Sequence, residues 1–143
     1  MLGKSILRVT TKLLIPVIFL FGLYVQFHGD FGPGGGFQAG VIFAAALIVY
    51  ALVFGIRKAR RVISPAVVRV TLAFGVLLYA GVGVAGIVLG GNYLDYNVLA
   101  HDPVHGQHIG ILLIEFGVGA TVAAAMITIF LTFAGHNRSL EED

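Results

Sequence analysis

The chain has 143 residues, of which 58% are hydrophobic and 11% are charged, and this composition excludes an ordinary water-soluble domain. It contains no cysteine, which excludes disulfides, iron–sulfur ligation, thiolate nucleophiles and cysteine zinc sites. A net charge of +2 could indicate an acidic partner. The basic residues must first be placed relative to the membrane spans, because topology can also account for them.

The first two apolar segments predict two membrane-crossing helices. A helix needs about 20 residues to cross a hydrocarbon core about 30 Å thick. The first helix is expected at about 10–27, after the basic residues Lys4, Arg8 and Lys12. The second is expected at about 37–56, where no charged residue occurs, and it ends at a basic cluster of Arg57, Lys58, Arg60 and Arg61.

Two further segments complete the predicted fold. The third helix is expected at about 66–90, because Ser64 and Pro65 suit the N-cap and the first helical position. The fourth is expected at about 109–134, followed by a polar cytoplasmic tail at 135–143. The sequence therefore predicts an all-α, polytopic membrane protein with four transmembrane helices in a single domain over residues 1–143.

The basic residues of this arrangement sort to one side of the membrane. With both termini in the cytoplasm, all nine Lys and Arg residues fall in the N-terminal segment, the region 57–69 or the tail, and the two opposite loops contain none. Basic residues concentrate in cytoplasmic loops, so the pattern predicts an N-in and C-in orientation. Topology thus accounts for the basic cluster, and no nucleic-acid partner is expected.

The first outside loop is rich in glycine and predicts an unusual backbone path before the second helix. Glycine can adopt positive φ, whereas proline fixes φ near about −65°. We interpret the motif as a compact turn between antiparallel helices, whose free N–H groups could also hold an anion. No phosphate-loop lysine follows, so nucleotide binding is not expected. The motif comprises Gly32, Pro33, Gly34, Gly35, Gly36, Phe37 and Gly40.

Glu115 is the single ionisable residue inside the fourth predicted helix, about six residues and roughly 9 Å from its outer end. At that depth a carboxylate needs a partner or a proton. His108 lies one heptad earlier on the same face, and water, a tyrosine or another subunit are alternatives. Glu115 is either part of a proton or cation path or a hydrogen-bonded interface residue. Asp30 and His28 at the outer mouth could likewise attract cations, or serve only solubility.

The second outside loop contains several histidines and acidic residues, among them His101, Asp102 and His105. Their spacing matches no familiar metal motif, and we predict helix capping or interface contacts, with no metal and no cofactor. The chain also lacks a nucleophile paired with a base and carboxylates at catalytic spacing. We therefore do not expect an enzyme.

Two motifs make the chain resemble the MnhB-like family, whose members are subunits of the Mrp-type multisubunit Na+/H+ antiporters. One is Gly32-Pro33-Gly34-Gly35-Gly36-Phe37-Gln38-Ala39-Gly40. The other is His101-Asp102-Pro103-Val104-His105-Gly106-Gln107-His108-Ile109-Gly110, continuing through Glu115 to Thr128. The resemblance covers nearly the whole chain. The family commonly has Asn where Asp30 stands, and a carboxylate there would attract cations more strongly.

The resemblance implies a four-helix subunit of a prokaryotic plasma-membrane assembly whose larger members resemble proton-pumping subunits of respiratory complex I. Its implied partners are the other antiporter subunits and membrane lipid, with Na+ and H+ as transported ions. The implied task is coupled Na+ efflux and H+ uptake for pH and sodium homeostasis. Two alternatives remain: a bracing subunit without its own ion path, and the equivalent subunit of a complex I-related membrane-bound hydrogenase or similar redox-driven ion pump.

Overall fold

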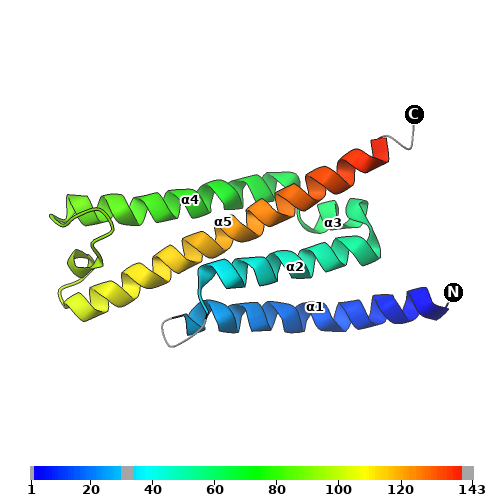
Figure 1. The fold of residues 1–143 in the computed structure, drawn as a ribbon, viewed down its shortest axis with the longest axis horizontal. Helices are drawn as coiled ribbons and strands as arrows, with labels where there is room; N and C mark the ends of the chain where they lie inside the picture. The colour runs from blue at the N-terminus through cyan, green and yellow to red at the C-terminus, as the bar shows by residue number, and fades with distance from the viewer. Residues whose placement is uncertain (1, 30–33, 140–143) are drawn as a thin grey trace.

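The computed structural model describes residues 2–29 and 34–139, and all its regular elements are helices (Figure 1). Four of them are long and apolar enough to cross a membrane, which confirms the predicted all-α fold with four such helices. A short helix and a 3₁₀ turn lie in the connections. In chain order the elements are α1 (Leu2–His28), α2 (Gly36–Phe54), α3 (Ile56–Val62), α4 (Pro65–Val88), η1 (Tyr96–Leu99) and α5 (Pro103–Ser139).

Several helix ends differ from the predicted bounds, and local backbone chemistry explains two of them. The second helix ends at Phe54 because Gly55 adopts a φ of 92°, and the basic residues after it form the separate helix α3. The fourth helix begins at Pro103 instead of 109, because the Asp102 carboxylate accepts a hydrogen bond from the Val104 N–H at 3.2 Å. Hydropathy detects only the apolar part of this helix, which begins at 109.

The other large differences lie at the two chain ends, and the remaining helix bounds differ from the predicted ones by one or two residues. α1 begins at Leu2, well before the predicted start at 10, and α5 continues to Ser139. Residues 135–139, predicted as part of a polar tail, are therefore helical. The last residues of that tail, 140–143, lie outside the described part of the chain.

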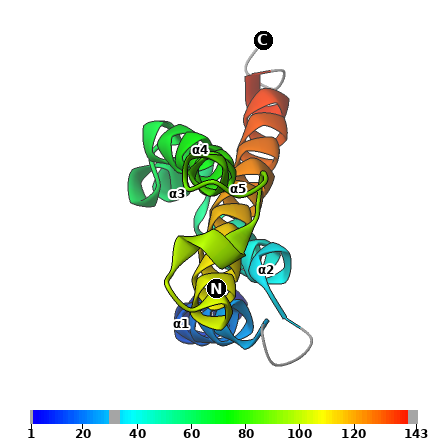
Figure 2. The same cartoon turned by 90° about the vertical axis from the view of Figure 1, so that its left-hand side faces the viewer.

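Helix α5 lies at the centre of the bundle, with α2 and α4 packed on different sides of it and α1 packed on α2 (Figures 1 and 2). Glycines make the two contacts with α5 close. A Cβ on Gly40 of α2 would lie 2.6 Å from the carbonyl oxygen of Gly119, and one on Gly75 of α4 would lie 2.7 Å from that of Gly117. Small residues allow helix backbones in a membrane to approach in this way. The buried apolar side chains are accordingly small, consisting mostly of alanine and valine.

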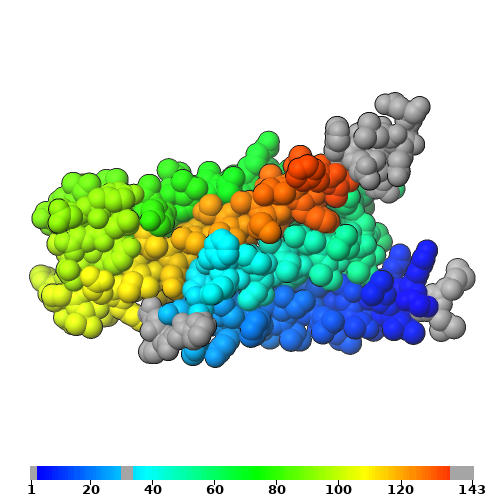
Figure 3. Space-filling model, viewed as in Figure 1, coloured from blue at the N-terminus to red at the C-terminus, as the bar shows by residue number. Residues whose placement is uncertain are grey.

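The α1–α2 and α4–α5 connections lie at the same end of the bundle but at different positions along its long axis. α4, η1 and the start of α5 extend beyond the ends of α1 and α2 (Figures 1 and 3). The start of α2 lies beside Glu115, which is twelve residues and about 18 Å along α5 from Pro103. The end of the glycine-rich connection thus lies about a third of the way along α5.

Replacing Gly40 by alanine is expected to lower the stability of the subunit. The new Cβ would meet both the Gly119 carbonyl and the Val122 side chain, 2.9 Å away, and push α2 from α5. Overpacking of this kind costs about 1–3 kcal/mol. Thermal unfolding in detergent measures the effect, and Gly81→Ala is the matched control because nothing lies within 4 Å of its Cβ position. Equal midpoints for the two variants would contradict the expected close packing.

Candidate functional site

The most distinctive site of the structure is the place where Glu115 of α5 meets the glycines that flank the start of α2. A Cβ on Gly29 would lie 2.5 Å from Glu115 Oε1, and one on Gly35 would lie 3.0 Å from the same oxygen. A Cβ on Gly36 would collide with the backbone carbonyl oxygen of Glu115. Both the side chain and the backbone of Glu115 are therefore accommodated by positions that lack a side chain.

Gly35 connects the last turn of α1 to the first turn of α2. Its N–H donates to the carbonyl of Val25 at 3.0 Å, and its carbonyl accepts from the Ala39 N–H at 3.1 Å. Its φ of 110° is a conformation that side-chain-bearing residues rarely adopt, so glycine is required here for backbone conformation as well as for space. At Gly35 the backbone before the second helix thus has the positive φ that glycine permits.

The electrostatics of this site follow from the start of α2. Gly35, the N-cap residue, has no side chain to satisfy the first N–H groups of the helix, and the first turn contains no acidic residue. The Glu115 carboxylate, supplied from a different helix, lies at this end. A negative charge is favourably placed at a helix N-terminus, where the helix dipole is positive.

The other predicted site residues lie at different distances from Glu115. His28, the last residue of α1, stacks its ring on Tyr24 with centroids 5.0 Å apart, and it precedes Gly29, which lies beside the Glu115 carboxylate. His108 is exposed on α5, seven residues or about 10 Å along the helix from Glu115. Asp30, together with Gly32 and Pro33 of the loop motif, lies outside the described residues.

The other described residues of the loop motif differ in how closely they are packed. A Cβ on Gly34 would lie 2.8 Å from the Val25 carbonyl, and Gly40 is buried against α5. Phe37, by contrast, is 64% exposed, so its ring is left on the surface of the isolated subunit. The motif therefore contains glycines that allow close packing and one aromatic side chain that packs little within the chain.

The acidic residues of the second loop act as caps. Asp95 accepts a hydrogen bond from the Asn97 N–H at 3.2 Å at the start of η1, and Asp102 accepts one from the Val104 N–H at the start of α5.

Within residues 2–29 and 34–139, no three His, Asp or Glu side chains gather as a metal site would require. Burial raises the pKa of the Tyr96 phenol, with smaller contributions from Tyr79 and Tyr93.

Gln26 on α1 is a residue that the sequence analysis missed. Its side chain is only 4% exposed, and its Oε1 would lie 2.7 Å from a Cβ on Gly119. Its Nε2 has no hydrogen-bond partner among the residues that the structure describes. An amide carries no charge, so the pattern of charged residues does not single it out. The available signal was a lone amide near the end of an otherwise apolar helix.

Comparison with known proteins gives consistent matches over most of the chain. Residues 6–128 match a protein-family profile described as a domain related to the MnhB subunit of Na+/H+ antiporter. The chain is 32% identical over 133 residues to proteins named "Putative antiporter subunit mnhB2" from Staphylococcus aureus strains Newman, JH1 and Mu3. Each alignment covers 91% of this chain and 94% of the relative.

Proposed function

Because this chain belongs to the MnhB family of Na+/H+ antiporter subunits, we propose that it is the MnhB-type component of a multisubunit cation/proton antiporter. It contributes to coupled Na+ efflux and H+ uptake in the plasma membrane of a prokaryote, together with the other subunits of the complex. We place both termini in the cytoplasm, because that orientation puts every Lys and Arg on the cytoplasmic side.

The observation that supports a direct part in transport is the position of Glu115. It is the single Asp or Glu within the four candidate spans, 3–28, 36–54, 65–88 and 103–135. Carboxylates inside membrane spans are costly and typically line ion or proton routes. With α5 beginning at Pro103, Glu115 is about twice as far along its helix as the apolar pattern had indicated.

We propose that Glu115 accepts and releases the proton, or holds the cation, on a route completed by neighbouring subunits. His28 lies on the α1 side of this region, because it precedes Gly29 at the carboxylate. Asp30 and His108 are the candidate groups for access from the loop side. Such a route needs other subunits because four helices alone do not enclose a gated aqueous pathway.

The bracing alternative is favoured by the same contact. A carboxylate at the start of α2 holds that helix against α5, and this would be useful even if no ion ever reached Glu115. The two functions make different demands on the side chain. Bracing needs a hydrogen-bonding group of the right shape, whereas transport needs a group that changes its charge.

Deletion of this chain tests the proposed function directly. In cells whose other Na+/H+ antiporters have been removed, loss of this subunit should abolish growth at high Na+ and Na+-dependent proton movement in inverted vesicles. Re-expression of the full chain should restore both. Undiminished exchange in its absence would contradict the proposal.

A further inference from the structure

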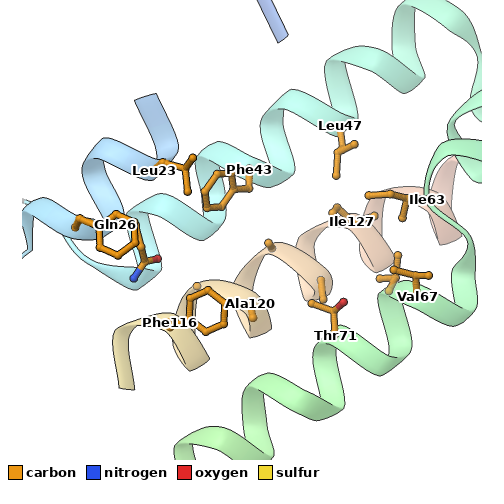
Figure 4. Close-up of a pocket in the computed structure, with 15 residues that line it drawn as sticks. Leu23, Gln26, Phe43, Leu47, Ile63, Val67, Thr71, Phe116, Ala120 and Ile127 are labelled. Carbon is orange, nitrogen blue, oxygen red and sulfur yellow. The ribbon is translucent and has the colours of Figure 1, made fainter. Parts of the chain in front are cut away.

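A lateral groove of about 300 Å³ lies on the face of α5 that is flanked by α1 and α2 on one side and α4 on the other (Figure 4). Its floor consists of small residues of α5: Gly119, Ala120, Ala123 and Ala124. Its walls are almost entirely apolar, including Leu23 of α1, Phe43 of α2 and Val67 of α4. Figure 2 shows α1 and α4 on different sides of α5, and residues of both helices line the groove.

Gln26 is the polar group at one end of the groove, where Figure 4 shows its amide directed between α1 and α5. The side chain is 4% exposed, and Nε2 finds no acceptor within the described chain. An amide N–H left unpaired in a water-free environment is costly. Whatever fills the groove should therefore present a hydrogen-bond acceptor at this position as well as apolar surface.

The depth of Gln26 distinguishes between a lipid and a protein as the occupant. Gln26 lies beside Gly119, twelve residues or about 18 Å along α5 from Leu131. The Leu131 carbonyl accepts a hydrogen bond from Arg60 at 3.3 Å, at the basic end of the bundle where the hydrocarbon edge is expected. In a core about 30 Å thick, Gln26 is therefore about 12 Å from the opposite edge. Lipid acyl chains carry no acceptor at that depth, because their ester groups lie at the edges.

We propose that this groove receives a transmembrane helix of another subunit, which presents a hydroxyl, amide or carboxylate oxygen to Gln26 Nε2. The glycine and alanine floor lets such a helix approach α5 closely, as small residues do at helix contacts in membranes. This inference rests on the proposed function only in requiring that the chain assembles with other subunits. It assigns which face of the chain makes one of those contacts.

Photocrosslinking in the purified complex tests the assignment. Benzoylphenylalanine is placed in turn at Phe27 on the α1 wall and at Val67 on the α4 wall, and crosslinked peptides are identified by mass spectrometry. Both positions should capture the same transmembrane segment of one other subunit. Val76, nine residues from Val67 and therefore on the opposite face of α4, is the control and should not capture that segment. Adducts with lipid alone, with a second copy of this chain, or with unrelated segments would overturn the proposal.

Gln26→Leu provides an independent measurement that separates docking from internal packing. In the isolated chain the substitution removes an unpaired amide, so the thermal midpoint in detergent should stay the same or rise. In the complex it removes an intersubunit hydrogen bond, so retention of the contacting subunit should fall about threefold to tenfold. Gln38→Leu, at an exposed position on α2, is the matched control and should change neither value.

The opposite outcome of the Gln26→Leu experiment would contradict the proposal. A less stable isolated chain with unchanged subunit retention would make Gln26 an internal packing residue and overturn the docking proposal. Failure of this inference is distinguishable from failure of the proposed function, because the deletion test measures exchange whichever face makes the contact.

Discussion

Glu115→Gln is expected to leave the complex assembled while Na+/H+ exchange in inverted vesicles falls roughly tenfold or more, the equivalent of about 1.4 kcal/mol or more in barrier height. Glutamine has nearly the same shape, and its carbonyl oxygen can still accept hydrogen bonds at the start of α2. It cannot release a proton or balance a cation. The substitution therefore preserves the contact with Gly29 and Gly35 and removes only the charge change.

The control for this experiment is Asp102→Asn on the same helix. Asp102 caps α5 through the Val104 N–H, and asparagine is as good an N-cap as aspartate, so exchange should continue at the normal rate. Full exchange in Glu115→Gln would remove Glu115 from the transport route. Loss of assembly in Glu115→Gln would instead favour a bracing function that needs the negative charge of the carboxylate at the start of α2, and not only a hydrogen-bonding group of its shape.

The number of membrane helices and the family could both be predicted from the sequence. Hydropathy identifies four segments because each must be long and apolar enough to cross the bilayer, whichever helices pack against it. The resemblance to the MnhB family, based on the glycine-rich motif and the stretch from His101 onward, is confirmed by a match over residues 6–128. Hydropathy could not locate the start of α5, since the polar residues between Pro103 and His108 are helical for reasons of capping.

The surroundings of the candidate site were less predictable, because they depend on the register between α2 and α5. The sequence singled out both Glu115 and the glycines, but as separate features of a buried span and a surface loop. Their contact arises only because the start of α2 lies beside a residue that is about 18 Å along α5 from the start of that helix. Gln26 escaped notice for a related reason, since an amide becomes significant only when its lack of a partner is known.

Gly36→Val is expected to have the largest effect on folding of any single change at this site. A Cβ at Gly36 would collide with the backbone carbonyl of Glu115, and backbone cannot move aside as a flexible side chain can. We expect a loss of about 3 kcal/mol or more, near the upper end for overpacked positions, with little monodisperse subunit recovered in detergent. Size-exclusion profiles and thermal unfolding measure this, and Phe37→Val at the adjacent, 64% exposed position should behave like the unmodified chain.

A second substitution shows whether this loss comes from backbone contact or from the Glu115 side chain. Glu115→Ala removes the carboxylate but leaves the carbonyl in place, so the double variant Gly36→Val/Glu115→Ala should remain as unstable as Gly36→Val alone. Recovery in the double variant would mean that the carboxylate, and not the helix backbone, limits the approach of α2. In that case the two helices would have room to move relative to each other at the depth of Glu115, and a rigid contact could no longer be the basis of the bracing function.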